Sequence, residues 1–377
     1  MTVSATLGDR VVSEVKRLCY AGLDEATLLR EVAERLRHAV LFEGYCAHAV
    51  DPLSGLIANA IQEEMGGEKE VRLFLEYLYF AEDVNEYNSM ARSRRPVALL
   101  SEATGGRLER SLRYRELMES LGFGYELRGV FTVGPELWGA IDVRRERGRP
   151  DFKPHEVELL RRVAPHLGAG LKAAVLRSQA PPEEGESVPG VLVLDSRGQV
   201  SHYTAAAERW LKELEDPDSR WHEGHGPSAW REGKGLPAPV WIVVSALRRA
   251  LKPETERDRV SVPRICVRAR SGRWLSLQAS LSEPHTNGNS DTVLVIEPPG
   301  PNEMLWLNTA SYGLTARERS IVDLVVKGFS TKQISATLYI SEYTVQEHLC
   351  NVFDKVGVRG RQALVKRLFF DNIYPTL

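Results

Sequence analysis

Two helix-start signals in the C-terminal part of the chain constrain its fold more than any other feature. Thr315 is followed three residues later by Glu318, and Ser330 three residues later by Gln333. In such a capping box the hydroxyl accepts a hydrogen bond from the third backbone N–H of the helix, while the Glu or Gln side chain bonds back to the capping residue. The sequence therefore predicts two short helices separated by a tight turn.

A third helix is predicted to follow Ser341, which can cap it, and to end at Val356 before Gly357. At about 100° per residue, the apolar positions share one side, which must face a core: Val345, Leu349, Val352 and Val356. The opposite side faces solvent or DNA and carries Glu347, Cys350, Asn351 and Asp354. Two short helices joined by a tight turn form the geometry in which one helix enters the major groove of DNA.

Polar side chains at or beside this exposed side are suited to reading base edges. Gln346 and Asn351 can pair with adenine, and Glu347 can accept a hydrogen bond from cytosine. From Ser311 onward the chain has nine basic and six acidic residues, a net charge of +3. Because the whole chain has a net charge of -2, the remainder carries -5. A basic module on an acidic body indicates that this part of the chain contacts phosphate.

The segment from Leu314 onward resembles the LuxR-type helix-turn-helix of bacterial regulators. The resemblance is carried, in order, by Leu314-Thr315-x-Arg317-Glu318, Gly328-x-Ser330-x-Lys332-x-Ile334, Ile340-Ser341-x-x-Thr344-Val345-x-x-His348-Leu349 and Lys355-Val356-Gly357-Val358-x-x-Arg361. It implies an all-α four-helix tail that binds double-stranded DNA.

The resemblance also implies roles for single residues of the tail. Gln346, Glu347 and Cys350 occupy base-reading positions, and the helix-face argument adds Asn351. Phosphates would be touched or framed by Lys332, Thr344, His348 and Lys355. The family commonly has lysine where Gln346 stands, and often serine where Gly360 caps the fourth helix. The missing lysine is expected to change which DNA sequence is read.

Two polar, proline-containing stretches, residues 178–186 and 298–302, divide the chain. A chain of 377 residues is also too long for one ordinary domain. We therefore expect an α+β multidomain fold, with a first domain at 1–177, a second at 188–298 and the helix-turn-helix domain at 308–377.

The first domain is predicted to contain a helix near Glu25–Ala39, a pair of strands at Gly129–Val133 and Leu137–Val143, and a long helix at Pro154–Leu176. This order resembles a GAF sensor domain, which implies an α/β sensor. Six aromatic residues either line a ligand pocket or, as core packing favours, fill the interior: Tyr77, Tyr79, Phe80, Tyr87, Tyr125 and Trp138.

The second domain is predicted to open with a hairpin, whose apolar strand begins at Val191 and whose turn contains Asp195 and Gly198. The following elements are expected to be helices at Ala205–Leu214 and near Val240–Leu251, and strands at Val260–Arg268, Arg273–Ser282 and Thr292–Glu297. The opening resembles a PAS sensor domain, an α/β sensor, with Thr204 where that family has asparagine. Asp195 is interpreted as a turn residue, because the acidic pair and lysine that a phosphoacceptor needs are not found.

The cysteines and histidines do not predict a metal site. Cys19, Cys46, Cys266 and Cys350 are scattered, without a CxxC pair, which is typical of a reducing compartment. His222 and His225, with His202 and Cys266 elsewhere, lack the context that makes zinc motifs specific, and a glycine-rich loop is favoured. Cys350 as a redox switch is a minor alternative.

The chain is interpreted as a transcription regulator whose sensor domains control the tail. No GxSxG, HExxH, P-loop or kinase motif is found, so an enzyme with an appended DNA-binding tail is disfavoured. A ligand-independent scaffold controlled by protein partners stays open. No secretory signal pattern or membrane-spanning run is found, which favours the cytoplasm.

The expected partners are duplex DNA, RNA polymerase, a small-molecule ligand of either sensor domain, and a second copy of the chain. The cofactor is unknown. A homodimer is expected because one recognition helix reads too few base pairs for tight binding. Its contacts are predicted in Pro154–Leu176 and in the stripe of Val365, Leu368 and Phe369.

Overall fold

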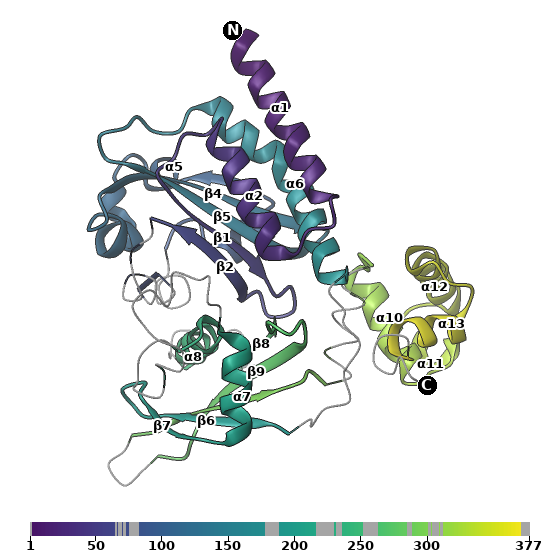
Figure 1. The fold of residues 1–377 in the computed structure, drawn as a ribbon. Coiled ribbons are helices and arrows are strands. Elements are labelled where there is room, and N and C mark those ends of the chain that lie inside the picture. Colours follow the sequence, from purple (N-terminus) through teal and green to yellow (C-terminus); the bar gives the residue numbers. More distant parts are fainter. Residues whose placement is uncertain are drawn as a thin grey trace.

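A computed structural model gives the architecture of most of the chain. It describes residues 2–64, 66, 70, 73–74, 83–177, 188–215, 230, 236–251, 263–284, 289–300, 303, 309 and 312–370. These residues form two antiparallel five-stranded sheets with their helices and a C-terminal group of helices (Figure 1). The mixed fold predicted from the sequence is confirmed at this level. Among the described residues, no helix has the length and apolar character needed to cross a membrane.

The first sheet has the strand order β2-β1-β5-β4-β3. Its strands are β1 (Gly44–Val50), β2 (Ile57–Glu63), β3 (Val97–Leu99), β4 (Phe123–Val133) and β5 (Glu136–Glu146). One face is covered by three helices, α1 (Thr2–Cys19), α2 (Glu25–Arg37) and α6 (Pro154–Arg177) (Figure 1). The helical elements described between β2 and β4 are α4 (Tyr87–Arg92), α5 (Leu100–Thr104), η1 (Leu108–Arg110) and the π-helical η2 (Tyr114–Met118).

The predicted helix α2, the paired strands β4 and β5 and the long helix α6 are confirmed, but β4 begins at Phe123, six residues before the predicted start at Gly129. α1 is not predicted from the sequence, although Val11, Val15 and Cys19 lie four residues apart and are buried. α6 approaches the sheet closely, because a Cβ atom at Gly168 would lie 2.7 Å from the carbonyl oxygen of Thr132. Only glycine fits this crossing.

The second sheet has the order β7-β6-β10-β9-β8, which is the same relative strand order as in the first sheet. Its strands are β6 (Gly190–Leu194), β7 (Val200–Tyr203), β8 (Arg264–Arg268), β9 (Trp274–Leu281) and β10 (Thr292–Glu297), and its helices are α7 (Ala205–Leu214) and α8 (Ala238–Ala250). Thr204 caps α7 by accepting a hydrogen bond from the N–H of Ala207. Asp195 accepts hydrogen bonds from the N–H groups of Arg197 and Gln199, which confirms its turn role.

The two segments predicted to be the first and second domains contribute to one shared core. Leu56, Ile57 and Leu117 of the first domain belong to the same buried apolar cluster as the residues of α8 and β9. Asp51 also accepts a hydrogen bond from the N–H of Cys266 at 3.3 Å. The predicted linker 178–186 lies outside the described residues, as do His222, His225, Tyr77, Tyr79 and Phe80.

The C-terminal domain consists of α10 (Ala316–Val326), α11 (Thr331–Leu338), α12 (Glu342–Val356) and α13 (Arg361–Val365), which continues into the π-helical turn η6 (Lys366–Phe370). Its apolar cluster is built on Leu314, Ile321, Ile334, Leu349 and Leu364, each at most 1% exposed. The predicted four-helix arrangement is confirmed.

Candidate nucleic-acid interface

Both predicted capping boxes are present. The hydroxyl of Thr315 accepts a hydrogen bond from the N–H of Glu318, whose carboxylate accepts from the N–H of Thr315 at 2.6 Å. Ser330 and Gln333 make the equivalent pair at 3.3 and 2.8 Å. These bonds satisfy backbone N–H groups that a helix start otherwise leaves open, so they fix where α10 and α11 begin.

The turn between α11 and α12 passes through a left-handed residue that is not glycine. Tyr339 ends α11 with φ 54° and ψ 45°, and its side chain is 94% exposed. Ser341 then caps α12 by accepting from the N–H of Thr344, and Gly357 ends α12 with φ 73°. α11 and α12 therefore form the helix pair expected from the sequence.

α12 presents the predicted apolar side inward. Its four buried residues are Val345, Leu349, Val352 and Val356. The predicted base-reading residues are all exposed: Gln346, Glu347, Cys350 and Asn351. Of the predicted phosphate-contacting residues, Lys332 on α11 is exposed, and Thr344 and His348 on α12 are half-buried. The structure thus brings seven of the eight onto α12, with Lys332 on the neighbouring helix.

A polar junction holds the start of α12 against its neighbours. The Gln346 side-chain amide donates to the hydroxyl of Thr331 at 3.1 Å, and that hydroxyl also accepts from Arg361 at 2.8 Å. Arg361 donates a second hydrogen bond to the carbonyl of Phe329. The Gln346 side chain is therefore positioned before any DNA contact is made.

Lys355, the eighth predicted site residue, has a partner within the tail. Its ammonium lies 2.8 and 2.6 Å from the two carboxylate oxygens of Glu318. Burial alone would raise the pKa of the Glu318 carboxyl, but the hydrogen bonds from Lys355 and Thr315 outweigh burial and lower this pKa. A phosphate would have to compete with Glu318 for Lys355, so its phosphate role stays a prediction.

Two exposed tyrosines beside the helix-turn-helix were not singled out from the sequence. Tyr339 lies at the turn, and Tyr343 in the first turn of α12 is 79% exposed. Their rings are therefore open to solvent where the turn meets the start of α12. Their sequence signal is their position immediately before Ile340 and Thr344, which belong to the recognised motif.

Among the described residues, a buried carboxylate of the first domain contacts the tail. Glu136, at the start of β5, is 5% exposed and is paired with Arg319 of α10, which also donates to the carbonyl of Leu314. Lys172 of α6 lies nearby, where burial lowers the pKa of its ammonium and the Glu136 carboxylate partly offsets this effect. Figure 1 shows the tail beside the C-terminal end of α6.

Comparison with known proteins identifies the tail. Residues 312–368 match the family described as bacterial regulatory proteins, luxR family. Spore germination protein GerE of Bacillus subtilis is 48% identical over 56 residues, which are 15% of this chain and 76% of that protein. The transcriptional regulatory protein DegU of Brevibacillus brevis is 41% identical over 56 residues, 15% of this chain and 24% of DegU.

In longer relatives such as DegU, the similarity covers less than half of the relative's length. It covers 39% of the probable transcriptional regulator ycf29 of Cyanophora paradoxa, at 35% identity over 82 residues and 21% of this chain. Among solved structures, a VqmA dimer of Vibrio cholerae is 16% identical over 48% of this chain and 81% of that chain, with a TM-score of 0.20. The E. coli DhaR(N)–DhaL complex is 12% identical over 79% of this chain and 91% of that chain, with a TM-score of 0.23.

These structural scores are too low to inform on the first two domains. The tail match is different, because it covers three quarters of GerE and coincides with the two capping boxes and the exposed face of α12. The chain belongs to the luxR family of bacterial regulatory proteins, and its C-terminal domain is the DNA-binding helix-turn-helix of that family.

Proposed function

We propose that the chain regulates transcription by placing α12 in the major groove of duplex DNA, under the control of its first two domains. The observation that carries this proposal is the division of α12 into an apolar side buried on α10 and α11 and a polar side that is exposed. N-terminal residues of a recognition helix reach the floor of the groove. Gln346 and Glu347 lie in that part of α12.

We assign base reading to Gln346, Glu347, Cys350 and Asn351. Phosphate contacts are assigned to Lys332, Thr344, His348 and Lys355, of which Lys355 must leave Glu318 to make one. The exposed rings of Tyr339 and Tyr343 flank the start of α12 and are placed to pack on the sugar-phosphate backbone. Phosphate contacts fix the register of the protein on DNA, and base contacts select the sequence.

The first and second domains are proposed to be GAF-like and PAS-like sensors. Their support is the five-stranded antiparallel sheet in each, with the same relative strand order. The shared core makes the two sensors one mechanical unit, and the Glu136–Arg319 contact joins that unit to the tail. A signal can act on DNA binding by changing which tail geometry is favoured.

We further propose that the working form is a homodimer, with a small-molecule ligand in a sensor domain and RNA polymerase as further partners. Two recognition helices on paired half-sites multiply specificity. Light scattering of the full chain with its DNA site should give the mass of one duplex plus two monomers of 42.2 kDa each. At micromolar concentration, a monomer mass without DNA and a mass of one monomer per duplex with DNA contradict the dimer.

The proposed DNA-binding function is tested with the full chain. A random duplex library is first selected on the protein, and affinities for the selected and a scrambled duplex are then measured at several salt concentrations. Because counterions are released from neutralised phosphates, affinity should fall steeply as salt rises. Lys332→Ala should reduce the salt slope by about one unit on both duplexes.

A matched lysine provides the control. Lys327, the residue that ends α10, is exposed and paired with Asp323, and it is not among the residues assigned to DNA. Lys327→Ala should leave the slope unchanged. No enrichment of any sequence and no binding at low salt would overturn the proposed function.

A further inference from the structure

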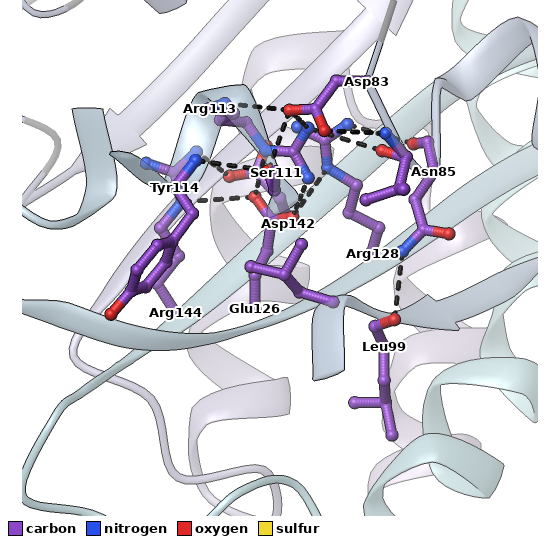
Figure 2. Close-up of polar contacts among 12 residues, drawn as sticks. Asp83, Asn85, Leu99, Ser111, Arg113, Tyr114, Glu126, Arg128, Asp142 and Arg144 are labelled. Carbon is purple, nitrogen blue, oxygen red and sulfur yellow. Dashed lines mark hydrogen bonds and ion pairs between the residues drawn. The ribbon is translucent and has the colours of Figure 1, made fainter. Parts of the chain in front are cut away.

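The face of the first sheet that points away from α1, α2 and α6 carries buried charged and polar side chains. Alternate residues of a strand point to opposite faces. On β5, Asp142 and Arg144 therefore share this face, and on β4 Glu126 and Arg128 share it (Figure 2). All four are at most 1% exposed. Such groups are costly to bury unless they are paired or bind a ligand.

β1 adds two potential metal ligands to the same face. Cys46 pairs directly with Asp142 across the β1–β5 ladder, and His48 follows two residues later. Cys46 is 3% exposed, and His48 and Asp142 are fully buried. The Cys46 Sγ, one ring nitrogen of His48 and one Asp142 carboxylate oxygen all lie within 4.8 Å of one another. Their placement follows from strand register, not from sequence proximity.

Tyr87 of α4 completes a four-residue group. Its hydroxyl lies 2.6 Å from Asp142 Oδ2 and 3.2 Å from His48 Nε2. His48 Nε2 is 3.5 Å from Asp142 Oδ2, and His48 Nδ1 is 3.7 Å from Cys46 Sγ. A tetrahedral ion with bonds of about 2.0–2.3 Å holds its ligands roughly 3.3–3.8 Å apart. Of the two His48 nitrogens, Nε2 faces the oxygens of Asp142 and Tyr87 and Nδ1 faces the sulfur of Cys46, and one ion binds only one of them. An ion on Nε2 therefore requires the Cys46 thiol to move toward the oxygens, and the Tyr87–Asp142 separation, that of a hydrogen bond, must widen.

We propose that Cys46, His48, Tyr87 and Asp142 bind a divalent transition-metal ion of the Zn²⁺ or Fe²⁺ class. A thiolate with an imidazole selects such ions over Mg²⁺ and Ca²⁺, which prefer oxygen ligands alone. The site goes beyond the proposed DNA binding and does not rest on it. The sequence alone did not reveal it because His48 and Asp142 lie 94 residues apart.

The charges around the site determine how many protons must leave when a divalent ion binds. Among the described residues around the site, Arg113, Arg128 and Arg144 face the carboxylates of Asp83, Glu126 and Asp142. These six charges cancel. Arg144 takes the Oδ1 side of Asp142 at 2.7 Å, which leaves Oδ2 directed to His48 and Tyr87. If one divalent ion enters as the Cys46 thiol and the Tyr87 phenol each lose a proton, the buried charge stays zero.

The test uses the full chain purified from cells grown with added Zn²⁺ or Co²⁺, because buried ligands are loaded most readily while the domain folds. After loosely bound ions are removed on a chelating resin, elemental mass spectrometry should find about one ion per chain. The cobalt form should show a thiolate-to-cobalt charge-transfer band. Cys46→Ser should lose the band, and His48→Gln should lose the ion.

Two thiols serve as controls. Cys266 is as buried as Cys46, at 2% exposed, and Cys350 is the exposed thiol of α12. Cys266→Ser and Cys350→Ser should keep both the ion and the band. Tyr87→Phe, which removes only the hydroxyl, should keep the band and lower the metal content.

Three results would overturn the site. One is a folded wild-type chain without bound ion after growth in either metal. Another is a cobalt band that survives Cys46→Ser, and the third is a band that disappears with Cys350→Ser. If Cys46→Ser does not fold, His48→Gln and the wild-type cobalt spectrum decide, because the absence of a band in the folded wild type is sufficient to reject the proposal.

Discussion

The tail and the first domain place their polar groups in opposite ways. In the tail, apolar residues fill the interior and the polar residues of α12 point outward, with Glu318 as the buried charged residue among those described. In the first domain, charged side chains of β4 and β5 lie inside, as Figure 2 shows. The tail is therefore specified by local capping and periodicity, whereas the first domain also depends on pairing of charges from distant parts of the chain.

The largest expected effect on stability comes from a substitution that removes one partner of these buried charge pairs. Glu126 is fully buried and faces Arg113, Arg128 and Arg144. Glu126→Ala leaves these guanidinium groups with less compensation, which should lower the free energy of unfolding of the full chain by about 3–5 kcal/mol. Urea unfolding followed by circular dichroism measures it.

The control for Glu126 is an exposed pair of the same chemistry. Glu119 bonds Arg147 with both side chains about half exposed. Glu119→Ala should cost less than about 1 kcal/mol, because solvent screens the pair. Equal losses in the two variants would show that the buried charges do not hold the first domain together.

The next effect concerns DNA affinity and tests the outward-facing side of the tail. Gln346→Ala should weaken binding to the selected duplex by about 1–3 kcal/mol and leave binding to a scrambled duplex almost unchanged. Gln362→Ala, at an exposed glutamine of α13, should change neither. If Gln346→Ala weakens both duplexes equally, Gln346 holds the backbone and the face of α12 must be reassigned.

A smaller effect comes from the Glu318–Lys355 pair. Since the pKa of Glu318 is lowered in the folded tail, its contribution to stability is present above the usual carboxyl pKa of 4.5 and is lost as pH falls through the lower folded value. Lys355→Met should cost about 1 kcal/mol at neutral pH and flatten this acid dependence. The measurement is the melting temperature of the tail, determined by thermal unfolding at several pH values from 3 to 7.

Lys327→Met is the matched control, since its pair with Asp323 is exposed on both sides. It should leave the acid dependence unchanged. If Lys355→Met instead reduces the salt slope of DNA binding by about one unit and leaves stability unchanged, the result supports the phosphate role of Lys355.

The smallest effect tests the turn before α12. Tyr339 adopts a left-handed conformation that costs a residue with a side chain about 1–2 kcal/mol. Tyr339→Gly should therefore be more stable than Tyr339→Ala by roughly 1 kcal/mol, because both lose the ring and only glycine avoids the strain. Identical melting temperatures for the two variants would show that the turn relaxes.

The same contrast explains what could be predicted from the sequence. Thr315 and Glu318 are three residues apart, so the hydrogen bond between them could be predicted from the sequence. The helices of the tail and the buried side of α12 could be predicted from similar local patterns. Asp142 and Arg144 alternate with Ile141 and Val143, a pattern typical of a strand with one solvated face. Both faces of β5 are buried, because Glu126 and Tyr87 approach from elsewhere.

Long-range contacts also account for the features of the candidate interface that the sequence did not reveal. Lys355 looked like a free cation because Glu318 lies 37 residues earlier. The Gln346–Thr331–Arg361 junction joins three helices and has no signature within any one of them. Cys46 and His48 sit two residues apart on a strand, and their relation to Asp142 depends on a register that only the folded sheet defines.

Strand β5 connects the contact with the tail to the buried polar group of the first domain. β5 begins at Glu136, which holds Arg319 of the tail, and six residues later carries Asp142, which faces His48 and Tyr87. At about 3.4 Å per residue these two carboxylates are roughly 20 Å apart on one rigid element. Thermodynamic reciprocity then ties the two sites together: if a ligand on the buried polar face of this sheet changes the affinity of the tail for DNA, DNA must change the affinity for that ligand by the same factor.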